Sequence, residues 1–125
     1  MSLLQKKKDF EQYFLDNYSE TSIHWSGTKW NINNNSEWVY FEYKGKSVKT
    51  NGLSNDEYTH TGTVLLTVVS ETMFRCNEIS DIVVSLFQGK EISNMFMQDL
   101  TIMSQGSFDE TNHSYIDLEL RFYMI

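Results

Sequence analysis

Apolar and polar positions follow a helical period between residues 72 and 88. Six apolar residues recur there at helical spacing: Cys76, Ile79, Ile82, Val83, Leu86 and Phe87. Polar side chains gather on the opposite side, so the pattern predicts an amphipathic helix with one face in a core. Thr72 is suited to cap the first turn, because its hydroxyl can accept from a free amide. Gly89 is suited to end the helix, because glycine tolerates a left-handed conformation.

Strand patterns lie on both sides of this helix. Residues 61–70 are apolar and β-branched, which is typical of a buried strand. Residues 37–44 are dense in aromatics, and residues 115–124 alternate strictly between apolar and polar, as a half-buried antiparallel strand does. Shorter strands are predicted at residues 23–25 and 95–103.

A first helix is predicted over residues 3–18, with its apolar residues roughly on one side. Its polar, solvent-facing side is expected to carry Lys6, Lys7, Lys8, Glu11 and Gln12. Residues 30–36 and 105–113 are predicted turns, the first because asparagine tolerates positive φ. Residues 45–60 form a polar run with little periodicity, which predicts a long functional or flexible connection.

The order of helix, strands, helix and strands predicts a single α+β domain over residues 1–125: an antiparallel β-sheet with helices packed on one face. The one-sided patterns also predict which residues meet in the core. The helix is expected to contribute Ile79, Ile82, Val83 and Leu86. The strands are expected to contribute Leu66, Val68, Leu118, Leu120 and Phe122.

Composition narrows the range of functions. The 125 residues hold 10 basic and 17 acidic residues, a formal charge of −7, so a general electrostatic affinity for DNA is not expected. A single cysteine excludes an internal disulfide. The first ten residues, MSLLQKKKDF, lack the apolar run of a signal peptide, and no run has the length of a membrane span. We therefore expect a cytosolic protein, or part of an assembly made there, without a membrane partner.

The sequence offers little that points to catalysis or to a cofactor. No metal site is expected, because the three histidines are far apart and have no partner at ligand spacing: His24, His60 and His113. Cys76 falls on the inner side of its helix, where a thiol serves as packing. Asp109 and Glu110 are adjacent carboxylates in a turn, and a solvated turn explains them. We predict no catalytic, cofactor-binding or metal-binding residues.

The order and spacing of short motifs carry a resemblance across roughly residues 23–122. The motifs are Ile23-x-Trp25 with Trp30 close behind, Trp38-Val39, Thr61-Gly62 with Leu65-Leu66 and Val68, Leu86-Phe87 before Gln88-Gly89-Lys90, and Tyr115-x-x-Leu118-x-Leu120. This layout resembles the small tail-terminator, or tail-completion, proteins of long-tailed phages and prophages, a group of minor tail proteins. The chain departs from them in its glycine-poor polar connection and its asparagine-rich turn.

The resemblance implies a structural subunit of the virion tail, assembled in the cytoplasm of the host bacterium and without enzymatic activity or cofactor. Such subunits form a homo-oligomeric ring, expected to be a hexamer. The ring caps the tail tube, stops its polymerisation and joins it to the head. The implied partners are further copies of the chain, the tail tube protein and the head–tail connector protein. DNA passes through the lumen without specific binding, which an acidic chain allows.

Within such a ring, the connection over residues 45–60 is the predicted subunit interface. Basic residues precede acidic ones along it, and a head-to-tail contact can pair the two signs between neighbours. The predicted interface residues are Lys44, Lys46, Lys49, Asp56, Glu57 and Tyr58. A solvated hairpin arm is the alternative interpretation of the same residues.

Two other functions remain open from the sequence. One is another neck or head-completion protein of similar size, which would meet the portal side rather than the tail tube. The other is a small ligand-binding or enzymatic α+β domain with a pocket under its sheet. A ring favours the first two hypotheses, whereas a deep pocket with convergent polar groups in a monomer favours the third.

Overall fold

The computed structural model describes residues 3–27, 36–49, 58–108 and 112–124 of the chain. Two helices and six strands occur in the described residues. In chain order they are α1 (Leu3–Asn17), β1 (Ser22–Trp25), β2 (Trp38–Lys49), β3 (Tyr58–Ser70), α2 (Met73–Phe87), β4 (Glu91–Ile92), β5 (Met95–Ser107) and β6 (Ser114–Met124). The predicted turn at residues 30–36 lies outside the described residues except for Ser36.

The strands form one curled sheet in the order β1-β2-β3-β6-β5-β4, and the fold is α+β as predicted. Every neighbouring pair is antiparallel except β1 and β2, which run parallel. The expectation of a wholly antiparallel sheet is therefore wrong at this edge. Residues 26–37 separate the two strands, which is long enough for the crossover that parallel pairing requires.

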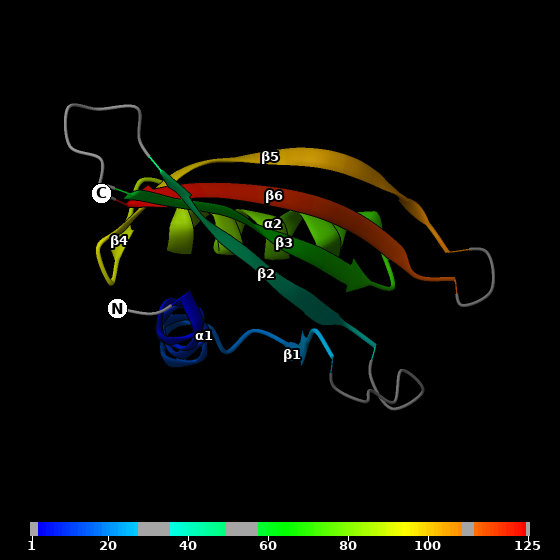
Figure 1. The fold of residues 1–125 in the computed structure, drawn as a ribbon. Helices are drawn as coiled ribbons and strands as arrows, with labels where there is room; N and C mark the ends of the chain where they lie inside the picture. Colours follow the sequence, from blue (N-terminus) through cyan, green and yellow to red (C-terminus); the bar gives the residue numbers. More distant parts are fainter. Residues whose placement is uncertain (1–2, 28–35, 50–57, 109–111, 125) are drawn as a thin grey trace.

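Both helices lie within the curve of the sheet, with α2 directly against its central strands (Figure 1). The predicted ends of α2 are confirmed. The side-chain oxygen of Thr72 accepts from the amide of Arg75 at 3.2 Å, which satisfies one first-turn donor. Gly89 has φ of +71°, a left-handed conformation that lets the chain leave the helix.

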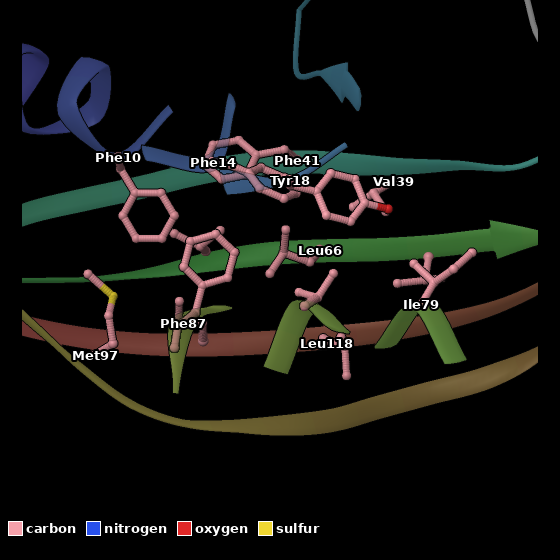
Figure 2. Close-up of a cluster of buried hydrophobic side chains, with 14 of the residues drawn as sticks. Phe10, Phe14, Tyr18, Val39, Phe41, Leu66, Ile79, Phe87, Met97 and Leu118 are labelled. Atoms are coloured by element: carbon pink, nitrogen blue, oxygen red, sulfur yellow. The ribbon is translucent and has the colours of Figure 1, made fainter. Parts of the chain in front are cut away.

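The core between helices and sheet is rich in aromatic rings. Phe10 and Phe14 of α1 pack on Phe41 of β2 and on Phe87 of α2, with ring centroids 5.0 to 5.7 Å apart. Figure 2 shows these rings beside Leu66 and Leu118. The predicted core residues all belong to this cluster, with Ile82 and Leu86 partly buried at its margin and the others buried. The space under the sheet is thus filled by side chains.

Two predicted connections are shorter than the sequence indicated. The prediction that residues 45–60 form a connection is wrong at both of its ends, across half of its length, because β2 continues to Lys49 and β3 begins at Tyr58. The two strands stay in unbroken register from Trp38–Val69 to Lys49–Tyr58. Residues 50–57 lie outside the described part. Similarly, β5 continues to Ser107, inside the turn predicted at residues 105–113.

Lys6 corrects the predicted solvent-facing side of α1, because only 2% of it is exposed. Its ammonium donates to the backbone oxygen of Ser93 and, at 3.2 Å, to the hydroxyl of Ser93. That hydroxyl donates in turn to Asp9 Oδ2 at 2.6 Å. Ser93 and Asn94 have φ of 51° and 65° and form the tight turn between β4 and β5. The three polar side chains therefore fasten α1 to the start of β5.

Candidate subunit interface

The predicted interface residues begin with Lys44 on β2, which is exposed and already has an anionic partner. Its Nζ lies 3.0 Å from Glu42 Oε1, and the hydroxyl of Tyr40 donates to Glu42 Oε2 at 2.9 Å. These bonds, from Lys44 first and Tyr40 second, hold the pKa of Glu42 below its ordinary value. The sequence analysis did not anticipate this pair within one strand.

The structure places three more of the predicted residues in a backbone ladder. Lys46 lies opposite Thr61, and Lys49 lies opposite Tyr58, in the antiparallel pairing of β2 with β3. Asp56 and Glu57 lie outside the described residues. The predicted interface is therefore a two-stranded arm along Lys44, Lys46, Lys49 and Tyr58, with backbone hydrogen-bonding groups as well as charge.

One side of this arm has no partner strand in the described chain. β1 pairs with β2 only as far as Phe41, whose backbone oxygen accepts from the amide of Ser26 at 2.9 Å. Alternate residues of a strand direct their backbone N–H and C=O to the same side. Every second residue after Phe41 therefore directs its backbone N–H and C=O away from β3. These residues are Tyr43, Gly45, Ser47 and Lys49. We call residues 42–49 the β2 edge.

A second unpaired edge lies along β5, three strands away from β2 in the sheet order. β4 pairs only with the start of β5, where the amide of Met97 donates to the oxygen of Lys90 at 2.8 Å. Beyond Met97, no strand of the described chain pairs with this side of β5. The register between β5 and β6, followed across its two irregularities, shows which β5 residues direct their backbone N–H and C=O away from β6. They include Leu100, Ile102 and Gln105. We call residues 98–107 the β5 edge.

The β5 edge exposes large apolar side chains. Ile102 is 57% exposed and Met103 is 56% exposed. An unpaired strand that leaves apolar side chains in water is a contact or aggregation site, which natural proteins protect or use. The sequence analysis predicted the strand but missed this surface. The adjacent apolar pair Ile102-Met103 was the available signal.

Three of the groups considered for chemistry have packing contacts, whereas the side chain of His60, Asp109 and Glu110 lie outside what the structure describes. The structure describes no cluster of three or more His, Cys, Asp or Glu side chains that could hold a metal ion. Cys76 is fully buried, with Sγ 3.2 Å from the backbone oxygen of Ser114, and burial raises the pKa of its thiol. His24 packs edge-on against Tyr40, and His113 packs against Trp38, each with ring centroids 5.2 Å apart.

Polar clusters elsewhere also have structural roles. Arg75 of α2 pairs with Glu37 at 3.0 Å and Glu20 at 3.3 Å, which ties the helix to the segments around β1 and β2. A shallow hollow of about 300 Å³ lies against β6 and contains Asp117. Both carboxylate oxygens of Asp117 already accept hydrogen bonds, from Thr67 at 2.6 Å and Ser104 at 2.5 Å. Within the described residues, the two sheet edges are distinguished by unpaired backbone groups, which at β5 lie beside exposed apolar side chains.

Comparisons with known proteins bear on the fold. No protein-family model matches the chain. No curated protein matches it. Several solved structures match, and one of them is similar over 100% of this chain and 96% of its own, with a TM-score of 0.75 and 12% sequence identity. At this identity the likeness shows a shared fold and nothing more. No helix in the described part of the chain is long and apolar enough to cross a membrane.

Proposed function

We infer that this chain is a structural, non-enzymatic subunit of a phage or prophage tail. Copies of it form a ring that caps the tail tube, stops its polymerisation and joins it to the head. One observation supports the proposal most: a single sheet carries two different unpaired edges, one at each side. A head-to-tail ring needs two such different surfaces on every subunit, whereas a two-fold dimer needs one surface that pairs with itself.

The interior and the charge are in keeping with this role. Aromatic rings occupy the space under the sheet where a ligand-binding domain of this size would hold its pocket. The net charge of −7 disfavours tight binding to the DNA that passes through such a ring. The resemblance in motif order described above is the basis for proposing six copies in the ring. It is also the basis for proposing the tail tube and connector proteins as partners.

The test is polymerisation of the tail tube protein of the phage or prophage that encodes this chain. Purified chain added to growing tubes is expected to stop elongation and to appear as a cap at one tube end in electron micrographs. The caps should have a mass six times that of the 14.7 kDa chain. Caps that bind isolated portal–connector complexes but never tubes would favour the head-completion alternative. A chain that forms no ring and leaves elongation unchanged would contradict the proposal.

A further inference from the structure

We propose that the β5 edge of one copy pairs with the β2 edge of the next copy as antiparallel strands, so that the sheet continues across the subunit boundary. This inference rests on the proposed ring, and it names the contact that builds the ring. Pairing of a strand with an exposed sheet edge is a common mode of recognition, in which backbone hydrogen bonds supply much of the affinity. Both edges have outward-facing backbone groups available for it.

Strand direction fits a head-to-tail contact. From β2 through β3 and β6 to β5, each neighbouring pair is antiparallel, so β5 runs opposite to β2. An incoming β2 that pairs antiparallel with β5 therefore runs in the same direction as the first β2. Each added copy repeats the orientation of the one before, as a rotation about a ring axis requires.

Charge favours pairing between unlike edges. The β2 edge contains three lysines and one glutamate, whereas the β5 edge contains Asp99 and no basic residue. Two β2 edges would bring two lysine-rich segments together, and like charges in directly opposed positions destabilise a strand pair. A β2 edge beside a β5 edge avoids this repulsion. Charge on the β2 edge thus favours pairing with a β5 edge over pairing with a second β2 edge.

The shape and apolar surface of β5 also point to a specific partner. Its register with β6 shifts between Met97 and Leu100 and again between Ile102 and Ser104. Such bulges bend and twist a strand, so a flat, unrelated edge fits poorly. A matching strand laid along β5 would cover the exposed side chains of Ile102 and Met103 from water. These two residues therefore belong to the buried centre of the proposed contact.

Two proline variants test the contact, Ile102→Pro on β5 and Ser47→Pro on β2. Both residues direct their amides outward, so proline removes a donor of the proposed contact without removing a bond of the chain's own ladder. Each variant alone is expected to lose the ring and give the monomer mass by light scattering. An equimolar mixture is expected to form a 1:1 dimer and nothing larger, because one intact edge of each kind remains.

Matched controls separate loss of contact from loss of fold. Ile102→Thr keeps the amide and is expected to retain a ring, weakened by the lost apolar surface. Phe74→Ser removes a side chain that is 75% exposed on α2 and is expected to leave the ring unchanged. Circular dichroism and thermal melting are expected to show folded monomers for both proline variants.

A second measurement covers the case in which proline unfolds the chain. Hydrogen exchange of the wild type is expected to slow at the amides of Ile102 and Ser47 in the ring, relative to the dilute monomer, by tenfold or more. Equal exchange rates in ring and monomer would overturn the inference. Rings formed by both proline variants would also overturn it. In either case the proposed function would stand. Dimers formed by Ser47→Pro alone would show self-pairing of β5 and also overturn it. A wild type that never forms rings would remove the proposed function itself.

Discussion

β5 and β6 are neighbours in one sheet, yet their surroundings differ. β6 has a partner strand on both sides, and its side chains alternate between buried and accessible from Ile116 to Tyr123. β5 has β6 on one side and, beyond Met97, no described strand on the other, and it leaves Ile102 and Met103 in water. The difference shows which strand is paired on both sides within the chain and which strand leaves an edge unpaired in the described residues.

The largest expected effect is a difference in the free energy of unfolding between substitutions on β6 and on β5. Leu120 of β6 is fully buried, so Leu120→Ala should lower the free energy of unfolding by roughly 2–5 kcal/mol, through lost burial and the cavity left behind. Ile102→Ala on β5 should change that of the monomer by no more than about 0.5 kcal/mol. Urea unfolding of dilute monomer measures both. Equal losses would show that β5 is supported within the chain as firmly as β6.

A smaller effect is expected where β5 begins. Lys6→Met keeps an apolar side chain of similar length and removes the ammonium that donates to Ser93. The partner groups on Ser93 are left without this donor, and the cost in unfolding free energy should be about 1–3 kcal/mol. Lys8→Met is the control, because Lys8 lies exposed on the same helix. An unchanged midpoint in Lys6→Met would show that the start of β5 does not depend on this contact.

The smallest effect concerns pH at the same turn. Hydrogen bonds from Ser93 and then Gln5 hold the pKa of Asp9 below its ordinary value. A carboxyl whose pKa is lower in the folded chain adds stability above its unfolded pKa of about 3.9, and this is lost as pH falls through the folded value. Asp9→Asn should therefore show a shallower loss of stability below about pH 4 than the wild type. Superimposable pH profiles would contradict this role.

Sequence reasoning worked best where one element meets the core alone. The apolar positions of α2, the Thr72 cap, Gly89 and the alternation of β6 each follow from local spacing, and the structure confirms them. In these segments each side chain faces either the core or the solvent. A periodic pattern is then enough to predict both the element and the face that it buries.

Features that depend on distant parts of the chain could not be predicted from the sequence. Lys6 is polar by type, and its burial depends on Ser93, 87 residues away. The strand character of residues 45–49 comes from backbone pairing with β3, in a segment whose sequence lacks an alternating pattern. Likewise, whether an edge is paired depends on the whole strand order. The candidate interface predicted from the sequence therefore lies on a two-stranded arm and stays a prediction, whereas the unpaired edge of β5 could be identified only from the structure.

The central claim is that the exposed edge of β5 is a contact between copies of this chain. The most direct test is the mass by light scattering, over a rising concentration series, of the wild type and of the matched variants Ile102→Lys and Phe74→Lys. Lysine at residue 102 would place an ammonium in the apolar centre of the proposed contact and beside the lysines of the incoming β2 edge, whereas lysine at the exposed position on α2 does not touch the edge. We predict a ring mass for the wild type and Phe74→Lys, and a folded monomer of 14.7 kDa for Ile102→Lys. A ring of unchanged mass in Ile102→Lys would contradict the claim.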